Sequence, residues 1–569
     1  MPTPAELLRS YWGFDHFRPL QEDIIRDLLE GKDVLALLPT GGGKSLCYQI
    51  PALYKPGFCL VISPLIALMK DQVAGLRQKG IPAEAIHTGM PYREVAQILE
   101  QAIHDRIKLL YVSPERIGTG LFLEYLPGMT INLLAVDEAH CISAWGHDFR
   151  PAYRRIAALR AQIPPVPVLA LTATATPAVQ ADIREQLEMI PPIVFQGPLL
   201  RPNLSFSVLE ESDKPQRLVR ILERVQGSGI VYCSSRKATE HIARYLNEQG
   251  ITADHYHGGM AAGIRHRKQT AWMAGNVRTM VCTSAFGMGI DKSDVRLVLH
   301  YDVPDSLENY YQEAGRAGRD GGRAYAILLY DARDIQTLEQ LPVLRYPGEQ
   351  VIREVYRDLV HFLQIPADCG EMEWYPFHLE TFLGRFGRNA TSTLYALKAL
   401  EQEELLLYAE QAHLPARLSF TTGKQELYRF QRENPSFTPL IEALLRTYPG
   451  VFDQPVQIFE RQLSRITRTH DEEVSNQLLQ LDRTGLLSYQ PPVNTPQLRL
   501  LQPRLRLEDL RIDYRNYLLR KDECTARIRR MIAYLEESAL CRSQFINQYF
   551  GDSAAAPCGI CDVCRGRTS

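Results

Sequence analysis

Short apolar runs separated by longer amphipathic segments dominate the chain between about residues 33 and 330. Each run is three to five residues long and lacks the apolar–polar alternation of a strand with one solvent-exposed face. Such runs are typical of strands buried on both faces, and the amphipathic spacers between them predict parallel α/β sheets. The predicted strands are 34–38, 59–62, 108–112, 133–136, 168–171, 229–233, 279–282, 297–299 and 326–329.

A break rich in proline and glycine, near residues 197–202, divides this α/β region into two blocks of strands. We therefore expect two parallel-sheet domains, at 1–200 and 201–345, with a cleft between them. Ligands of open α/β sheets bind at the carboxyl ends of strands, so this is where candidate chemistry is sought.

Beyond about residue 345 the pattern changes to helices with short strands, and the chain repeats itself at an offset of 81 residues. Each copy reads as a helix that runs into a strand, then a polar turn and a second strand, which is the order of a winged helix. The repeat predicts an inserted region, 346–503, with tandem winged-helix modules whose second strands are 417–420 and 497–501. Chance similarity between apolar helix–strand corners is the alternative. The matching pairs are Leu397 with Leu478, Leu400 with Leu481, Leu405 with Leu486, Leu406 with Leu487, and Tyr408 with Tyr489.

Composition narrows the class of protein. Of the 569 residues, 45% are apolar and 23% charged, as expected of folded globular domains. The formal charge of -2 excludes a wholly cationic surface, so any nucleic-acid contact must come from local patches. No apolar run approaches the roughly 20 residues of a membrane helix, and the N-terminal segment lacks an export signal. We therefore expect a cytoplasmic protein without membrane contact.

A glycine-rich turn, 39–45, follows the first predicted strand. Its glycines allow backbone N–H groups to surround phosphates, while Lys44 reaches the outer phosphates and the Ser45 hydroxyl binds Mg²⁺. Leu38 stands where the usual pattern has its first glycine, but the run Gly41 to Gly43 supplies the same freedom later in the turn. A merely flexible turn is the alternative, and the strand, the Lys–Ser pair and the following helix argue against it.

Two adjacent carboxylates come directly after the predicted strand 133–136. At that place Asp137 is expected to hold Mg²⁺ through water, and Glu138 to orient and deprotonate an attacking water. An isolated Asp–Glu pair is usually a solvated loop. The phosphate loop about 90 residues upstream favours the catalytic interpretation.

The thirteen residues that follow Asp-Glu-Ala-His, 141–153, mix aromatic and basic side chains. Trp145 and Phe149 suit stacking on unpaired bases, at roughly 1–3 kcal/mol per base, and Arg150 suits a phosphate or a base plane. The alternative is that the aromatic side chains fill the core between the two lobes. Their neighbours are mostly polar, which favours a DNA-sensing role.

Further motif-like segments lie in both α/β blocks. Gln21 ends the segment 13–21 and suits contact with an adenine edge, and Ser63 is a hydroxyl at the end of a predicted strand. Arg316 and Arg319 lie three residues apart on one predicted helix, from which they would reach across the cleft to a γ-phosphate. Solvated arginines are the alternative.

Four of the eleven cysteines cluster near the C-terminal end of the sequence, within the segment 504–569 that we assign to a zinc subdomain. One cysteine followed after sixteen residues by a closely spaced triplet predicts a closed tetrahedral Zn²⁺ site, which stabilises a fold and has no open position for catalysis. Cys524 is an alternative ligand. The other seven cysteines are scattered, as is typical of reduced thiols in the cytosol. The four clustered residues are Cys541, Cys558, Cys561 and Cys564.

Taken together, these motifs resemble the RecQ family of superfamily 2 DNA helicases over about residues 5–340. The resemblance implies two RecA-like motor domains and ATP-driven unwinding with 3′ to 5′ movement on single-stranded DNA. The residues before and within the cysteine cluster also look like the RecQ zinc subdomain. The segments that carry the resemblance are 13–21, 40–45, 137–140, the aromatic-rich loop to 153, 286–292 and 312–321.

The resemblance also implies roles for single residues. Arg319 is preferred over Arg316 as the arginine that completes the γ-phosphate site, and Ser45 and Asp137 are the Mg²⁺ ligands. The implied catalytic residues are Lys44, Asp137, Glu138, Gln312, Arg316 and Arg319. The implied ATP contacts are Phe14, Arg18, Gln21, Thr40, Gly41, Gly42, Gly43, Lys44, Ser45 and Asp291. The implied DNA contacts are Ser63, Trp145, His147, Phe149, Arg150 and Thr283.

The order of the C-terminal modules departs from the family pattern. In the family the zinc subdomain usually follows the second motor domain directly, whereas about 160 residues intervene here. The accessory helicase-and-RNaseD-like domain of many members is expected to be absent, and whether the inserted hairpin separates strands stays open.

The resemblance sets an expected function beside three alternatives. We expect a monomeric helicase of recombination and repair, bound to single-stranded and duplex DNA, with single-strand-binding or repair proteins as candidate partners. A duplex translocase or remodeller, an RNA helicase and a non-enzymatic DNA-binding scaffold are the alternatives.

Overall fold

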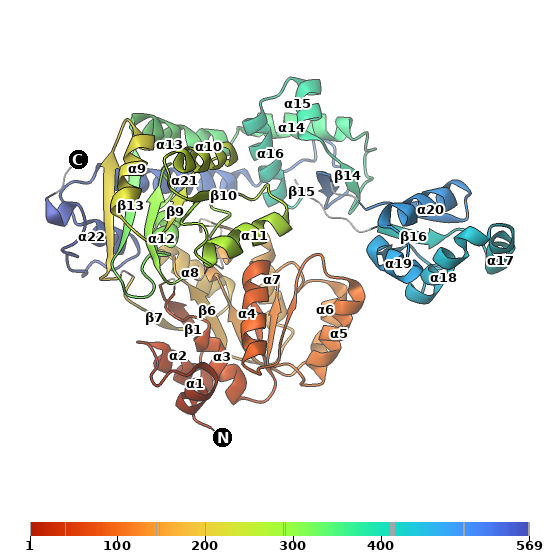
Figure 1. Ribbon diagram of the computed structural model, residues 1–569, viewed down its shortest axis with the longest axis horizontal. Coiled ribbons are helices and arrows are strands. Elements are labelled where there is room, and N and C mark those ends of the chain that lie inside the picture. Colours follow the sequence, from red (N-terminus) through yellow and green to blue (C-terminus); the bar gives the residue numbers. More distant parts are fainter. Residues whose placement is uncertain are drawn as a thin grey trace. The chain divides into compact units, whose positions relative to one another are not determined.

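The chain divides into two compact units (Figure 1): residues 1–342 with 518–569 form the first, and residues 343–517 form the second. Three predicted site residues, Thr40, His147 and Asp291, lie outside the described part of the chain. The computed structural model describes residues 2–39, 41–143, 145–146, 148–189, 191–199, 201–287, 290, 292–409, 416–492 and 495–566.

The first sheet of the first unit has seven parallel strands in the order β3-β4-β2-β5-β6-β1-β7. Leu35 and Leu37 of β1 pack into one core, and Val34 and Ala36 pack into another. Alternate residues of a strand point to opposite faces, so helices cover this sheet on both sides and its central strands are continuously apolar. The strands are β1 (Val34–Leu37), β2 (Phe58–Ile62), β3 (Ala83–Ile86), β4 (Leu109–Val112), β5 (Ile131–Val136), β6 (Val168–Thr172) and β7 (Ile193–Gln196).

The second sheet of this unit has six parallel strands in the order β10-β11-β9-β12-β13-β8. It too separates two cores, with Ile230 and Tyr232 of β9 on one face and Val231 on the other. The predicted α/β class is therefore confirmed for both blocks. The strands are β8 (Leu204–Glu210), β9 (Ser228–Tyr232), β10 (Ala253–Tyr256), β11 (Thr279–Cys282), β12 (Val295–His300) and β13 (Ala324–Tyr330).

The helices of the first unit connect these strands and complete its C-terminal segment. Within the described residues, none is long and apolar enough to cross a bilayer. The α-helices are α1 (Pro4–Trp12), α2 (Gln21–Leu29), α3 (Leu46–Tyr54), α4 (Ile66–Gln78), α5 (Tyr92–Ile103), α6 (Gly120–Tyr125), α7 (Arg155–Arg160), α8 (Pro177–Gln186), α9 (Lys214–Arg224), α10 (Arg236–Glu248), α11 (Ala262–Met273), α12 (Leu307–Ala314), α13 (Ala332–Arg345), α21 (Tyr514–Glu536) and α22 (Arg542–Tyr549). The 3₁₀ helices are η1 (Leu126–Gly128), η2 (Ala139–Ile142), η3 (Pro151–Arg154) and η5 (Val563–Arg565).

All nine strands expected from apolar runs are present, and the four described strands of the first unit that escaped prediction share one property. β3 and β7 are the edges of the first sheet, and β8 and β10 are the edges of the second. An edge strand has only one neighbour and carries polar residues, as in the alternately exposed β7. A search for short, continuously apolar runs therefore finds the central strands of a sheet and misses its edge strands.

The C-terminal segment of the first unit packs on the second sheet. Met531 and Tyr534 of α21, and Phe550 just after α22, belong to the same core as the β9 residues Ile230 and Tyr232. The Tyr534 ring lies 5.3 Å from that of Tyr310 on α12. The zinc region is thus part of the hydrophobic core of the second sheet and not a separate appendage.

The second unit holds two small antiparallel sheets, β14-β19-β15 and β17-β16-β18. Its strands are β14 (Trp374–Pro376), β15 (Leu406–Ala409), β16 (Ala416–Phe420), β17 (Val456–Ile458), β18 (Leu487–Gln490) and β19 (Gln497–Leu500). Its helices are α14 (Glu349–Phe362), α15 (Leu379–Phe386), α16 (Ala390–Gln402), α17 (Lys424–Glu433), α18 (Thr438–Thr447), α19 (Glu460–Thr467) and α20 (Asp471–Arg483), with η4 at Pro435–Phe437.

The predicted hairpins of this unit are wrong, although the repeated helix–strand corners are present. β15 pairs with β19, and β16 pairs with β18, so each strand joins a partner about 70 to 90 residues away in the sequence. One module, 416–490, is therefore inserted between the two wing strands of the other. Leu406 and Leu487 occupy equivalent buried places at the starts of β15 and β18, which explains the repeat. The apolar pattern identifies a strand but not its partner.

Candidate active site

The glycine-rich turn connects β1 to α3, at the carboxyl edge of the first sheet. Gly41 and Gly43 both have φ of +76°, a conformation that favours glycine. A Cβ at Gly43 would overlap the amide of Gln21, and one at Gly41 would lie 3.2 Å from Cδ of Arg319. Ser45 begins α3 without using its hydroxyl as a cap; that hydroxyl bonds the Tyr48 side chain instead, so a ligand would have to replace or share this contact.

Two residues from the N-terminal segment hold this turn in place. The Gln21 amide donates to the carbonyl oxygens of Gly43, at 3.0 Å, and Gly42, at 3.3 Å. The Arg18 guanidinium donates to the carbonyl of Gly41, and the Arg18 N–H donates to Oε1 of Gln21 at 2.8 Å. Both ends of the Gln21 amide are thus occupied within the chain, so contact with adenine would require these bonds to exchange. That contact stays a prediction.

Asp137 lies at the end of β5 and is fixed by three neighbours. Its Oδ1 accepts from the N–H of Glu138 at 3.1 Å, its Oδ2 accepts from the Ser63 hydroxyl at 3.4 Å, and its carbonyl accepts from the Tyr153 hydroxyl at 2.9 Å. Burial, and then the charge of Glu138, raise the pKa of Asp137 to about 6, although Lys44 opposes the shift. A cation beside the carboxylate would favour its ionised form.

Glu138 has a strained backbone and a carboxylate with unused capacity. Its φ is +47°, an uncommon region for a residue other than glycine. Its Oε2 is buried and accepts no hydrogen bond within the described residues. The Nδ1 of His140 lies 3.4 Å from it and 2.9 Å from the Thr172 hydroxyl. Burial lowers the pKa of His140 to about 4, so the imidazole is neutral at pH 7 and does not neutralise Glu138.

Arginines that follow α12 of the second sheet face the carboxyl edge of the first sheet. Arg316 is buried and donates to the carbonyl of Gly287, while its Nε has no hydrogen-bond partner within the described residues. Arg319 donates to the carbonyl of Ile290 at 2.8 Å. Burial, and then the charge of Arg319, lower the pKa of Arg201 to about 10. Like charges held together in a largely buried place favour a polyanionic ligand.

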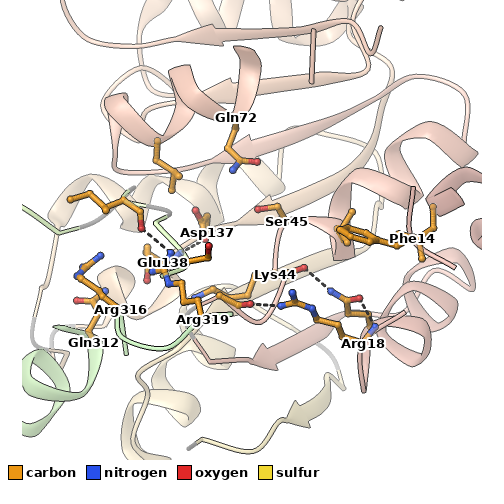
Figure 2. A pocket seen from close by; sticks show the side chains of 18 of the residues that line it. Phe14, Arg18, Lys44, Ser45, Gln72, Asp137, Glu138, Gln312, Arg316 and Arg319 are labelled. Carbon is orange, nitrogen blue, oxygen red and sulfur yellow. Dashed lines mark hydrogen bonds between the residues drawn. The ribbon is translucent and has the colours of Figure 1, made fainter. Parts of the chain in front are cut away.

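These groups surround one cavity of about 460 Å³ in the first unit (Figure 2). Both lobes line it: Lys44, Asp137 and Glu138 come from the first sheet, and Arg316 and Arg319 follow α12 of the second. Its volume falls in the usual range for small-molecule sites, roughly 300–1,000 Å³. The predicted residues that line it are Phe14, Arg18, Gln21, Gly41, Gly43, Lys44, Ser45, Asp137, Glu138, Gln312, Arg316 and Arg319.

The aromatic-rich loop lies directly beyond η2. Trp145 is half-buried and packs on the first-sheet core, which belongs to one lobe and is not the core between the lobes that the alternative described. Phe149 is also half-buried and has the Arg154 guanidinium 5.0 Å from its ring centre. Arg150 donates to Asp148 at 3.1 Å and to the Pro64 carbonyl at 3.4 Å. DNA binding by these residues stays a prediction.

The remaining predicted DNA contacts lie at strand ends, as expected. Ser63 follows β2 and is buried against Asp137, while Thr283 follows β11 and its N–H donates to Tyr256 at 3.2 Å. The Ser63 hydroxyl thus bonds Asp137, the predicted Mg²⁺ ligand, and contact of Ser63 with DNA stays a prediction.

Three residues escaped the sequence analysis. Arg201 donates to the Ala317 carbonyl at 2.7 Å and adds charge beside the cavity. Tyr153 fixes Asp137. Arg527 of α21 donates to the Trp145 carbonyl at 2.9 Å and so links the zinc segment to the aromatic-rich loop. Tyr153 ends the aromatic-rich segment 141–153 and bonds only sixteen residues back, whereas no local motif marks Arg201 or Arg527, whose partners lie more than a hundred residues away in the sequence.

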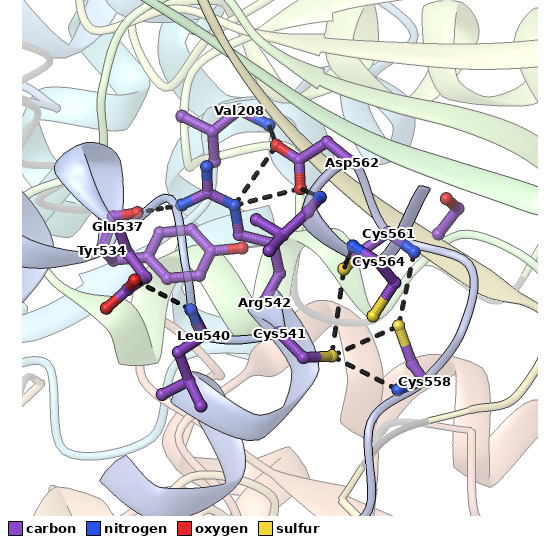
Figure 3. Close-up of polar contacts among 12 residues, drawn as sticks. Val208, Tyr534, Glu537, Leu540, Cys541, Arg542, Cys558, Cys561, Asp562 and Cys564 are labelled. Carbon is purple, nitrogen blue, oxygen red and sulfur yellow. Dashed lines mark hydrogen bonds and ion pairs between the residues drawn. The ribbon is translucent and has the colours of Figure 1, made fainter. Parts of the chain in front are cut away.

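The four predicted zinc ligands converge at the start of α22 and in the loop around η5 (Figure 3). Their sulfurs all lie within 4.8 Å of one another, with Cys541 Sγ 3.5 Å from Cys558 Sγ and 3.8 Å from Cys561 Sγ. Ligands at the Zn–S distance of about 2.3 Å in a tetrahedron lie about 3.8 Å apart, so the group fits Zn²⁺. Cys524 is not part of the cluster. The zinc prediction is confirmed.

Backbone N–H groups donate to three of these sulfurs, although burial still raises the pKa of Cys561 and Cys564. The N–H of Cys558 donates to Cys541 Sγ at 3.3 Å, and the N–H of Cys561 donates to Cys558 Sγ at 3.3 Å. Burial raises the pKa of Cys541, but donation from Cys558 and Gln544 outweighs it and brings the pKa to about 7. The thiolate is the form that binds metal.

A buried ion pair next to the cysteines joins the zinc segment to the second sheet. Arg542 Nε lies 3.1 Å from Oδ1 of Asp562, and the side chains are 6% and 4% exposed. The Asp562 Oδ2 accepts from the N–H of Val208 at 2.9 Å, and its own N–H donates to Phe206 at 3.1 Å. Both partners belong to β8, so the zinc segment covers this edge of the sheet.

Family models match successive parts of the chain. The DEAD/DEAH box helicase model matches residues 18–183, and the helicase conserved C-terminal domain matches 213–321. The RecQ helicase winged-helix domain of Bacteroidota matches 418–491, and the RecQ zinc-binding model matches 512–565. Two parallel sheets line one cavity, and the two helicase models match the regions that form these sheets. Together these observations place the chain in the class of superfamily 2 helicases.

Two curated relatives narrow this class. The ATP-dependent DNA helicase RecQ of Haemophilus influenzae is 46% identical over 342 residues, which cover 60% of this chain and 55% of the relative. The probable ATP-dependent DNA helicase RecS of Bacillus subtilis is 41% identical over 363 residues, which cover 63% of this chain and 73% of the relative. With the winged-helix and zinc-binding models, this match shows that the chain belongs to the RecQ family.

These matches cover only part of this chain and part of each relative. The chain spans about half the length of the first relative. Among solved structures, the DUF1998 helicase MrfA bound to DNA and AMPPNP matches with a TM-score of 0.50 at 18% identity, over 60% of this chain and 53% of that one. That likeness shows the fold alone.

Proposed function

We propose that this chain is an ATP- and Mg²⁺-dependent DNA helicase that moves 3′ to 5′ on single-stranded DNA, in recombination and repair. The observation that carries the proposal is the cavity in which a phosphate loop and an Asp–Glu pair from one sheet face two arginines from another. DNA as the substrate rests on the family and on the relatives, which are named DNA helicases.

In this proposal each lobe contributes part of the groups that hydrolyse ATP. The N–H groups of the glycine turn and Lys44 bind the phosphates, and the unpaired Oε2 of Glu138 takes the proton of the attacking water. Arg319 and Arg316 stabilise the charge that develops on the γ-phosphate, with Arg319 in contact with the turn. Ser45 and Asp137 would hold Mg²⁺, which would neutralise charge on the phosphate oxygens.

The catalytic groups are complete only when both lobes close on the nucleotide, so binding and release of ATP would change the distance between the lobes. Single-stranded DNA at the strand ends would then be moved stepwise. Trp145, Phe149 and Arg150 lie in the loop that begins just after Glu138, and in this proposal they report DNA binding to the hydrolytic site.

The test combines two assays on the full chain. ATPase rates are measured with single-stranded DNA, duplex DNA or RNA, and strand displacement is measured on a duplex with a 3′ tail and on one with a 5′ tail. The proposal expects stimulation by single-stranded DNA and displacement only from the 3′-tailed duplex. Stimulation by RNA alone, stimulation by duplex without displacement, or no hydrolysis would contradict it and indicate an RNA helicase, a translocase or a scaffold respectively.

A further inference from the structure

A second group of metal-ligating side chains lies on the second sheet, outside both the nucleotide cavity and the cysteine site. It consists of Glu240, His255 and His257. One nitrogen of each imidazole and one carboxylate oxygen all lie within 4.8 Å of one another. Neither the proposed hydrolysis nor the zinc subdomain uses these residues.

Strand geometry explains why these side chains meet. His255 lies in β10 and His257 just after it, so the two residues point to the same face. α10 covers that face, and the Asn247 side chain fixes it there by donating to the Ala253 carbonyl at 2.8 Å and accepting from the Ala253 N–H at 3.1 Å. Glu240 lies two helical turns before Asn247, on the same face of α10.

The distances suit one shared ion. Oε1 of Glu240 lies 3.2 Å from Nε2 of His257. Two nitrogen or oxygen ligands at about 2.0–2.1 Å from one tetrahedral Zn²⁺ lie about 3.3 Å apart. The ring centres of His255 and His257 lie 6.0 Å apart, with the planes inclined by 27°. His257 is buried and its Nδ1 has no hydrogen-bond partner within the described residues.

The surroundings favour a cation. Oδ1 of Asp254 lies 3.5 Å from Nδ1 of His255 and also pairs with the Lys268 ammonium. A carboxylate beside a ligating imidazole orients the ring, as is common in metal sites. Burial, and then the charge of Lys268, lower the pKa of His255 although Asp254 and Glu240 oppose the shift, so the imidazole favours the neutral form that can bind a metal. The Glu240 side chain is 48% exposed, which gives an ion a path from solvent.

We propose that Glu240, His255 and His257 form a second divalent-metal site, which takes Zn²⁺ through two imidazole nitrogens and one carboxylate oxygen and leaves a fourth position to water. Such a three-ligand site differs from the closed cysteine site in exchanging its ion more readily. The bound ion joins α10 to the end of β10 and so stabilises an edge of the second sheet.

Zinc stoichiometry of the full chain tests the proposal. After incubation with Zn²⁺ and removal of the excess, atomic emission should find about two zinc ions per chain, one for each group of ligands. Glu240→Gln and His255→Gln, the more exposed pair, should each retain about one. His241→Gln is the matched control, because His241 is an exposed neighbour on α10, and it should retain about two. About one zinc ion in the unmodified chain, or about two in both variants, would overturn the proposal.

Cobalt spectra give a second, independent readout on the same proteins. Co²⁺ in the cysteine site produces thiolate charge-transfer bands, whereas Co²⁺ bound by nitrogen and oxygen produces only weak ligand-field bands. The second equivalent of Co²⁺ should therefore add ligand-field absorption alone, and His255→Gln should abolish that addition. A second equivalent that adds thiolate bands, or adds nothing, would contradict the site. Neither readout involves ATP or DNA, so the result for this metal site is independent of the result for the proposed function.

Discussion

At the scale of single residues, Glu138 has two features that each lower the free energy of unfolding and that a purely structural role would not require. Its backbone lies in the left-handed region, and one buried carboxylate oxygen accepts no hydrogen bond within the described residues. Each feature opposes folding by about 1–3 kcal/mol. Such strain gathers where function needs it, in this case at the residue expected to receive a proton.

Glu138→Gln should retain ATP binding and lose hydrolysis, because the amide has nearly the same shape but does not take a proton. We expect kcat to fall by about 10²–10⁴, measured beside the affinity for a fluorescent ATP analogue. Glu124→Gln, on the exposed face of α6, is the control. Turnover near that of the unmodified chain would show that another residue is the base.

Arg319 is expected to act on the γ-phosphate, because its side chain contacts the phosphate loop across the cavity. Arg319→Lys keeps the charge but loses the planar fork, and kcat should fall by about 10³. The ATPase rate of this variant is compared with that of Arg333→Lys, an exposed arginine on α13. A loss confined to KM would assign Arg319 to binding alone.

At the scale of elements, the aromatic-rich loop is held at two neighbouring points near its start. Ser143 donates to Asp182 of α8 at 2.5 Å, and Arg527 of α21 donates to the Trp145 carbonyl at 2.9 Å. The loop also begins beside Glu138, through η2. Under the proposed function this loop would bind DNA. Because it begins beside Glu138 and is bonded to α21 of the zinc segment, it is suited to pass a signal between those two sites.

Trp145→Ala should leave ATP binding intact and uncouple hydrolysis from DNA. The indole is expected to stack on a base, at roughly 1–3 kcal/mol, and that contact is lost with the ring. The measurement is the ratio of ATPase rates with and without single-stranded DNA. An unchanged ratio would mean that Trp145 serves only the core on which it packs.

Arg527→Gln should lower the same ratio while leaving the rate without DNA unchanged, because the substitution frees the Trp145 backbone but touches no catalytic group. We expect a reduction of about 3- to 10-fold, which corresponds to roughly 1 kcal/mol for one charge-assisted hydrogen bond. Arg529→Gln, an exposed neighbour on α21, serves as the control. Equal effects in both variants would indicate a general loss of charge.

At the scale of the whole molecule, the zinc segment completes the second lobe. Cys541 and Cys561 belong to the core of the second sheet, and Asp562 covers the β8 edge. The zinc site therefore stabilises a motor lobe from the opposite end of the sequence. In the second unit, the nested modules likewise depend on strand pairs that lie far apart in the chain.

Zinc removal should consequently destabilise the second lobe and not only its C-terminal segment. With a strong chelator, or in Cys558→Ser, we expect Tm to fall by about 10 °C and β8 to become open to proteolysis. The measurements are thermal unfolding and limited proteolysis followed by mass spectrometry. Loss of order confined to residues after about 536 would contradict this coupling.

Much of the fold and site followed from local sequence. The central strands are predictable because burial on both faces requires continuous apolar runs, as in β1 and β5. Lys44, Asp137 and Glu138 are predictable because phosphate and metal chemistry require those groups at strand ends. The cysteine ligands are predictable because a closed zinc site requires four closely placed thiolates.

Only the tertiary structure decided the rest. Edge strands such as β7 and β10 carry too little apolar signal, and the partners of β15 and β16 depend on how distant segments pack. Arg201 and Arg527 gain their roles from contacts more than a hundred residues away. The local sequence pattern determines which residues are buried and what chemistry their side chains carry. Which strands pair, and which side chains meet at a site, is decided only when the whole chain packs.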